Sequence, residues 1–269
     1  MKSKGQIILT DVNTIEFVNV SFMYPNNSEY TLRNVNFQLR GDKITAIVGI
    51  NGVGKTTILK LLLRLYEPSD GQILINNTNI CEYDINSLRS KFGVVFQEYN
   101  TYELTVRENV AFSDIGNVNQ TNNILNACEK VGLNINNELQ FSDGIDTYIG
   151  KTFDENGFIL SCGMKQKLAI SRAFFKECSF FIMDEPNASL DLEAENKVFE
   201  NINKLSGGKG ALIITHKLST ALIADKIIVL SEGTVKEEGT HEELIRRGGI
   251  YKELYVMITN KYKINQERE

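Results

Sequence analysis

One short segment carries residue types and a spacing suited to holding phosphate groups. Gly49, Gly54, Lys55 and Thr56 lie in "GINGVGKTT" and satisfy the pattern Gly-x-x-x-x-Gly-Lys-Ser/Thr, with an apolar run before it and helically spaced leucines after it. Glycines let main-chain N–H groups close around phosphate oxygens, Lys55 can reach the outer phosphates, and the Thr56 hydroxyl can ligate Mg²⁺. The alternative interpretation of this segment is an ordinary glycine-rich turn between a strand and a helix. We therefore predict nucleotide binding by Asn51, Gly52, Gly54, Lys55, Thr56 and Thr57.

A second segment, "FFIMDE", ends an apolar run with two carboxylates. A buried strand that ends in an acid can direct Asp184 toward the metal ion held by Thr56, and Glu185 can act as general base on a water molecule. Alone, the segment would more often be a strand ending in solvated acids. After the glycine-rich segment, it predicts a site for phosphoryl transfer to water.

Composition limits the class of protein. The 269 residues are 42% apolar, enough for one large or two modest globular domains. A net charge of -5 and a pI near 5.3 argue against a nucleic-acid partner. Four cysteines without a Cys-x-x-Cys pair and only two histidines predict no zinc site and favour a reducing, cytosolic setting. No apolar run approaches the roughly 18 residues that span a bilayer, so we expect the chain itself not to be membrane-embedded.

The hydrophobic pattern predicts an α/β fold. Residues 15–22 largely alternate between apolar and polar, as in a strand with one buried face, and Asp70-Gly71 predicts a turn before another strand. Residues from about 104 to Gly150 are polar and Asn-rich, which indicates an inserted helical subdomain. Beyond it, the short runs "SFFIM", "ALIIT" and "KIIVL" alternate with helical patterns, as in a mostly parallel sheet covered by helices. Thr240 and Glu243 predict a capping box on a last helix that ends at glycines.

The order of these motifs resembles the nucleotide-binding domain of an ABC transporter over almost the whole chain. The resemblance implies that Tyr24 stacks on adenine and that Gln97, in "GVVFQEY", touches Mg²⁺ and the attacking water. It further implies that Asp191, in "NASLD", lies in a loop crossing to a second subunit, and that His216, in "LIITHK", lies beside the γ-phosphate. Alone, Tyr24 would be a hairpin core residue and His216 a buried imidazole. For His241 the structural interpretation, a residue in a helix's first turn, is preferred.

The resemblance also implies the fold class and the domain boundaries. We expect a P-loop NTPase core with a mostly parallel sheet, an antiparallel β subdomain and an inserted helical subdomain, together forming a single ABC ATPase domain over residues 1–269. Residues 1–98 and 165–269 would form the catalytic core with its N-terminal β subdomain. Residues 99–164 would form the helical, signature-bearing subdomain.

The segment from Leu160 to Met164 departs from the family pattern. Family members usually read Leu-Ser-Gly-Gly-Gln here, and the segment contacts the γ-phosphate bound to the other subunit of a head-to-tail dimer; this chain reads Leu-Ser-Cys-Gly-Met. Ser161 and Gly163 are retained, whereas Cys162 adds a Cβ and Met164 removes an amide that could complete a capping box. One hypothesis is weaker ATP-driven dimerisation, and the other is a tolerated variation of one lineage.

Further segments resemble the exporter branch of the family. "DENGFILSCGM" would place Glu155 near the cytoplasmic loops of a membrane domain, "SEGTVKEEGTHEEL" is similar to exporters, and "QKLAISRAFFK" resembles exporters of peptide antibiotics such as lantibiotics. The resemblance implies ATP and Mg²⁺ as cofactors. It implies two partners, a transmembrane domain and a second ABC ATPase domain, identical or different. The chain would be an excised or separately made half, held at the cytoplasmic side of the cell membrane.

Three rival functions share part of this pattern. A soluble ABC-type ATPase acting on DNA or ribosomes would carry the same nucleotide motifs, but we would expect basic surface and longer insertions. A small-molecule P-loop kinase would need an acceptor site and has no reason for a signature helix. A nucleotide-binding regulatory module with little turnover is favoured by the "SCGM" segment.

Overall fold

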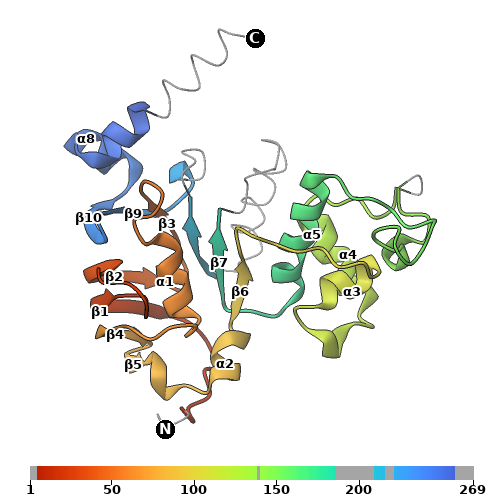
Figure 1. The fold of residues 1–269 in the computed structure, drawn as a ribbon, viewed down its shortest axis with the longest axis horizontal. Coiled ribbons are helices and arrows are strands. Elements are labelled where there is room, and N and C mark those ends of the chain that lie inside the picture. Colours follow the sequence, from red (N-terminus) through yellow and green to blue (C-terminus); the bar gives the residue numbers. More distant parts are fainter. Residues whose placement is uncertain (1–4, 138–139, 186–208, 216–220, 258–269) are drawn as a thin grey trace. The chain divides into compact units, whose positions relative to one another are not determined.

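The computed structural model describes residues 5–137, 140–185, 209–215 and 221–257. The chain groups into two compact units, traced by colour in Figure 1. Unit 1 comprises Met1–Lys91 and Gly208–Glu269, and unit 2 comprises Phe92–Gly207. The predicted helical segment 99–164 falls inside unit 2, and its boundaries stay a prediction.

An antiparallel sheet forms the first layer of unit 1, with strand order β2-β1-β4-β5. The strands are β1 (Thr14–Phe22), β2 (Leu32–Arg40), β4 (Asp70–Ile75) and β5 (Thr78–Asn79). Apolar side chains of β1 are buried on one face, as the alternation predicts, and Phe17 stacks on Phe37 of β2 with ring centroids 4.4 Å apart. The turn predicted at Asp70-Gly71 is wrong. These residues begin β4, where Gly71 has φ +77° and a Cβ would lie 2.2 Å from the carbonyl oxygen of Asn19.

The second group of strands in unit 1 has the order β10-β9-β3-β8. It contains β3 (Ile44–Val48), β8 (Gly210–Ile214), β9 (Lys226–Ser231) and β10 (Thr234–Gly239). Strand β3 pairs in parallel with both β8 and β9, while β10 pairs antiparallel with β9. Every residue of β3 and β8 is buried, as expected for parallel strands covered on both faces.

The helices of unit 1 include α1 (Lys55–Leu62), the short 3-10 helix η1 (Ile80–Glu82), α2 (Ile85–Ser90) and α8 (His241–Arg247). Of these helices, η1, α2 and α8 begin at side-chain caps, whereas α1 follows the left-handed Gly54. The capping box between Thr240 and Glu243 is confirmed, and Gly248 ends α8 with a left-handed backbone. Residues 250–257 are also helical, so α8 is not the last helix, contrary to the prediction. His241 is the first residue of α8, and its Nδ1 lies 2.9 Å from the hydroxyl of Tyr251.

Unit 2 combines a parallel strand pair with a group of helices. Strand β6 (Phe92–Val95) pairs with β7 (Phe180–Asp184). Helices α3 (Val106–Ala111), α4 (Thr121–Lys130) and α5 (Cys162–Phe175) pack against one another, and the 3-10 helices η2 (Ile115–Asn117) and η3 (Gly144–Asp146) join them (Figure 1). Among the helices that the structure describes, none has the length and apolar character needed to cross a bilayer.

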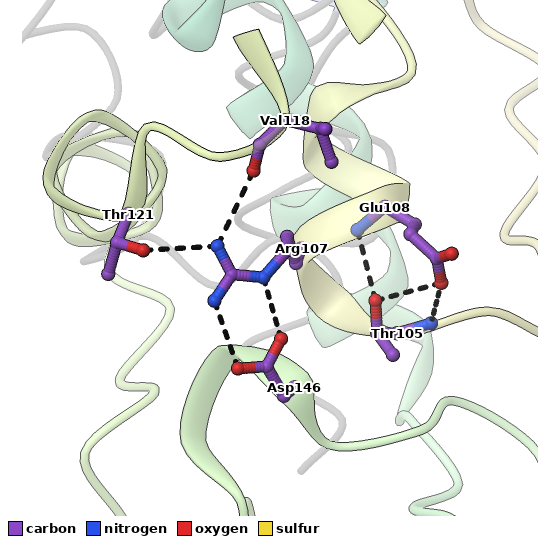
Figure 2. Close-up of polar contacts among 6 residues, drawn as sticks. All are labelled: Thr105, Arg107, Glu108, Val118, Thr121 and Asp146. Atoms are coloured by element: carbon purple, nitrogen blue, oxygen red, sulfur yellow. Dashed lines mark hydrogen bonds and ion pairs between the residues drawn. The ribbon is translucent and has the colours of Figure 1, made fainter.

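A polar network holds the N-terminal ends of α3 and α4 to η3 (Figure 2). Arg107 donates two hydrogen bonds to the Asp146 carboxylate, at 2.6 and 2.9 Å, and one to the Thr121 hydroxyl at 3.0 Å. The Arg107 guanidinium holds the pKa of Asp146 below its ordinary value. Beside it, Thr105 and Glu108 form a capping box at the start of α3. The network therefore ties three segments of unit 2 that are distant in sequence.

Candidate nucleotide-binding site

The predicted strand, glycine loop and helix are present in unit 1. Strand β3 ends at Val48 and α1 begins at Lys55. Only glycine fits at position 49, because a Cβ there would lie 2.2 Å from the carbonyl oxygen of Leu230. Gly54 adopts φ 101° as the N-cap of α1. The loop thus turns sharply and opens directly onto the N-terminus of a helix, which favours anion binding.

The side chain of Lys55, the first residue of α1, reaches back to this loop. Its residue is only 6% exposed, and its Nζ donates hydrogen bonds to the carbonyl oxygens of Gly49 at 2.8 Å and Ile50 at 2.9 Å. Asn51 and Gly52 are exposed, and Gly52 has φ 84° with no atom within 4 Å of where a Cβ would lie. A buried ammonium beside an open, glycine-rich turn at a helix N-terminus fits the phosphate groups of a nucleotide.

Tyr24 is attached to α1 through its hydroxyl. The hydroxyl oxygen lies 3.1 Å from the Thr57 Oγ1 atom and accepts a hydrogen bond from Lys60 Nζ at 3.4 Å. The Lys60 ammonium also lies 5.4 Å from the centroid of the Tyr24 ring, and Tyr66 packs edge-on at 5.2 Å. The ring is half-buried. The aromatic residue expected to meet the base is therefore held to the helix that follows the phosphate loop.

The predicted acids lie at the end of β7 in unit 2. Asp184 is the last residue of the strand and is 2% exposed. Glu185 follows with φ 47°, a backbone conformation that is uncommon for a non-glycine residue and frequent at functional sites. Gln97 Nε2 donates a hydrogen bond to Glu185 Oε2 at 3.2 Å, although the two residues are 88 positions apart. Unit 2 thus brings together the predicted base and the predicted glutamine.

The oxygen atoms offered by these residues suit Mg²⁺. The Thr56 hydroxyl, the Asp184 carboxylate and the Gln97 side-chain carbonyl are hard oxygen ligands. Thr56 is half-buried in the first turn of α1, and the Gln97 side chain uses its nitrogen for Glu185, which leaves its oxygen as an acceptor. Mg²⁺ commonly takes one or two protein ligands and completes its shell with phosphate oxygens and water. Each of these oxygen types therefore fits that ion, with Thr56 in unit 1 and Asp184 and Gln97 in unit 2.

The altered signature segment caps helix α5. Ser161 is the N-cap, and its Oγ accepts a hydrogen bond from the Met164 main-chain nitrogen at 3.3 Å. The side chain at position 164 cannot reciprocate as glutamine would, so half of a capping box is present. Ser161 and Cys162 are exposed, and Gly163 is half-buried. Two further predicted residues, Asp191 and His216, lie outside the described residues.

Comparison with known proteins decides the family. A family model described as "ABC transporter" matches residues 32–188. This chain belongs to the ABC transporter family. The match confirms the family predicted from the motifs, and it includes the glycine loop, the signature segment and both acids.

Individual proteins similar to this ABC chain support the same family assignment. The chain is 41% identical over 258 residues to the subtilin transport ATP-binding protein SpaT of Bacillus subtilis, covering 94% of this chain and 41% of SpaT. It is 36% identical to the nisin transport ATP-binding protein NisT of Lactococcus lactis subsp. lactis, with 95% and 42% coverage. The solved structure of a bacterial Atm1-family ABC exporter with ATP bound superposes with a TM-score of 0.85 at 30% identity, covering 96% and 43%. The fold class is confirmed, and the chain spans less than half the length of these relatives.

Sequence reasoning missed several residues around the ABC motifs. Lys60 and Tyr66, which contact Tyr24, were not singled out, although Lys60 lies in α1 and Tyr66 follows shortly after that helix. Arg172 and Asn109 in unit 2 were also missed. The signal for Arg172 was available, because it is a charged residue within the otherwise apolar "LAISRAFF" stretch of α5.

Proposed function

We propose that this chain binds ATP with Mg²⁺ and hydrolyses it as the ATP-binding part of an ABC exporter. The observation that carries the proposal is the phosphate loop, in which Lys55 is buried between a tight glycine turn and the N-terminus of α1. In such a loop, main-chain N–H groups and one ammonium replace the water molecules that solvate the phosphate oxygens. The family match supports the same assignment.

The residues of the site have distinct roles in this proposal. Lys55 holds the outer phosphates, Tyr24 offers its ring to adenine, and Thr56 and Asp184 offer oxygen ligands to Mg²⁺. When bound, Mg²⁺ supplies charge neutralisation on the phosphate oxygens. Glu185 accepts a proton from the attacking water, while Gln97, which donates to Glu185 at 3.2 Å, holds that water in line. His216 would assist beside the γ-phosphate.

A second ATPase domain completes each site. In the head-to-tail arrangement implied by the family, Ser161 and Gly163 of one domain meet the γ-phosphate held by the other, and Asp191 lies in the loop between the domains. The exposed Ser161 at the N-cap of α5 supports this role, because the start of a 14-residue helix faces solvent. ATP-driven closure then moves a transmembrane domain between two states.

The transported molecule is proposed to be a peptide, exported from the cytoplasmic side of the membrane through a transmembrane domain. Support comes from the names of two relatives, the subtilin and nisin transport ATP-binding proteins. A second candidate function is a nucleotide-binding regulatory module with little turnover. The half-complete capping box at Ser161 and Met164 favours it, since the altered segment offers fewer contacts to a second domain.

Two substitutions test the proposal. A fluorescent ATP analogue is titrated with Mg²⁺ into the wild-type chain and into Lys55→Ala and Glu185→Gln, and phosphate release is then measured for each. We expect Lys55→Ala to weaken binding by on the order of tenfold or more, since a charge-assisted contact is lost. We expect Glu185→Gln to bind normally and to lose phosphate release. Equal binding by Lys55→Ala and the wild type would contradict the proposal, and normal phosphate release by Glu185→Gln would remove the assigned base.

A further inference from the structure

Arg172 reaches from helix α5 to the segment that follows Gln97. We define the Gln97 segment as residues 96–104, which connect β6 to the start of α3. Arg172 Nη1 donates a hydrogen bond to the carbonyl oxygen of Asn100 at 2.8 Å. Its Cζ also lies 5.4 Å from the centroid of the Tyr102 ring. One side chain of α5 thus contacts two positions of the Gln97 segment.

Asn109 of α3 completes this contact. Arg172 donates from Nε to the Asn109 carbonyl oxygen at 2.9 Å and from Nη2 to the Asn109 Oδ1 atom at 3.1 Å. Asn109 is fully buried, and its Oδ1 also accepts from the Tyr102 main-chain nitrogen at 3.0 Å. Its Nδ2 donates to the carbonyl oxygens of Tyr102 at 2.9 Å and Leu104 at 3.3 Å. The Asn109 side-chain amide therefore hydrogen-bonds to both the N–H and the carbonyl of the Tyr102 main chain.

The chemistry of this cluster depends on the shape of the guanidinium. The acceptors of Arg172 are two main-chain carbonyls and one amide oxygen, which a planar fork of N–H groups can meet together and an ammonium cannot. The side chain is largely withdrawn from water, and this burial lowers the pKa of Arg172 from its ordinary value. The cluster is thus a fixed set of directed hydrogen bonds.

The two ends of the Gln97 segment are then both anchored. Near its start, Gln97 donates to Glu185 at the end of β7. Further along, Arg172 holds Asn100 and Tyr102 to helix α5, whose N-cap is the signature residue Ser161, and Asn109 of α3 holds the Tyr102 main chain. All of these residues belong to unit 2.

We propose that Arg172 and Asn109 are positioning residues for ATP hydrolysis, which lock the Gln97 segment to the signature helix. The inference rests on the proposed function, because it concerns how Gln97 is held against the base Glu185. Neither residue has to touch the nucleotide. Their effect is to make the glutamine and the start of α5 move as one body when the domains close.

A matched pair of arginine variants tests the proposal. Arg172→Lys keeps the charge and removes the fork, while Arg107→Lys does the same in the same unit at an arginine that bonds to Asp146, Val118 and Thr121 instead. Amide hydrogen exchange of residues 98–104, the dissociation constant for an ATP analogue, and kcat are measured for both. For Arg172→Lys we expect amide exchange in residues 98–104 to become faster and kcat to fall, each by on the order of tenfold. The ATP affinity should stay unchanged. For Arg107→Lys we expect neither change.

Two results would overturn the inference. One is unchanged exchange in residues 98–104 of Arg172→Lys, and the other is a loss of kcat no greater than that of Arg107→Lys. Should Arg172→Lys fail to fold, Tyr102→Leu is used, because Tyr102 is 37% exposed and stacks on Phe112 at the surface. This variant should speed amide exchange in residues 98–104. Unchanged exchange would count against the inference. A wild-type chain that hydrolyses no ATP would refute the proposed function, and the exchange data would still decide whether the lock exists.

Discussion

Removing Arg107 should destabilise unit 2 by about 2 kcal/mol, because an ion pair and a hydrogen bond are lost. The ion pair with Asp146 has good two-point geometry, but the Arg107 and Asp146 side chains are 21% and 55% exposed, so it contributes about 1 kcal/mol. The bond to the Thr121 hydroxyl at 3.0 Å adds about 1 kcal/mol, and the 3.4 Å contact with the Val118 carbonyl adds little.

A double-mutant cycle of Arg107→Ala and Asp146→Ala isolates the pair. Urea unfolding is followed by circular dichroism, because the chain has no tryptophan. The coupling free energy should be about 1 kcal/mol at neutral pH. Since Arg107 lowers the folded-state pKa of Asp146, this stabilisation is present above the unfolded-state pKa of about 4 and is lost as pH falls through the lower folded value. A coupling that is absent at neutral pH, or that grows toward acid pH, would refute the reasoning.

Three further predictions concern the nucleotide site and the signature segment. Tyr24→Phe removes the hydroxyl bonded to Thr57 and keeps the ring, so ATP affinity should fall by only about 2- to 10-fold. Tyr24→Ala is titrated for comparison, and its ATP affinity should fall further. A loss for Tyr24→Phe as large as that for Tyr24→Ala would argue against a role for the ring. Exposed Cys162 should react readily with a maleimide at neutral pH, whereas burial raises the pKa of Cys128 to about 12 and should protect it, as mass spectrometry of the labelled peptides would show; equal labelling would be inconsistent with the packing of α4. Cys162→Gly combined with Met164→Gln should tighten ATP-dependent dimerisation by on the order of tenfold, measured by analytical ultracentrifugation, and an unchanged constant would mean that the family variation is neutral.

The phosphate loop could be predicted from sequence because its chemistry is local. The spacing of Gly49, Gly54 and Lys55 dictates the backbone turn, and the apolar run before it forms the buried strand β3. The capping box at Thr240 is local for the same reason. Sequence patterns failed where a distant segment decides the conformation. The Asp70-Gly71 pair looks like a turn, but pairing with β1 makes it the start of a strand.

Contacts across many residues were beyond the sequence. The bond from Gln97 to Glu185 depends on the parallel pairing of β6 and β7, which places their following residues side by side. The lock joins Arg172 of α5 to Asn109 of α3, two residues that are 63 positions apart, and no spacing rule encodes this contact. The family pattern supplied the role of Gln97, whereas the sequence marked Arg172 only as a charge within an apolar stretch and did not indicate its partners.

The most direct test of the account is ATP hydrolysis by the purified chain over a range of protein concentrations, with Glu185→Gln as the control. We predict that specific activity rises with protein concentration, because paired domains complete each other's sites, and that it is lost in Glu185→Gln. Activity that is independent of concentration, or that survives in Glu185→Gln, would contradict the proposed mechanism.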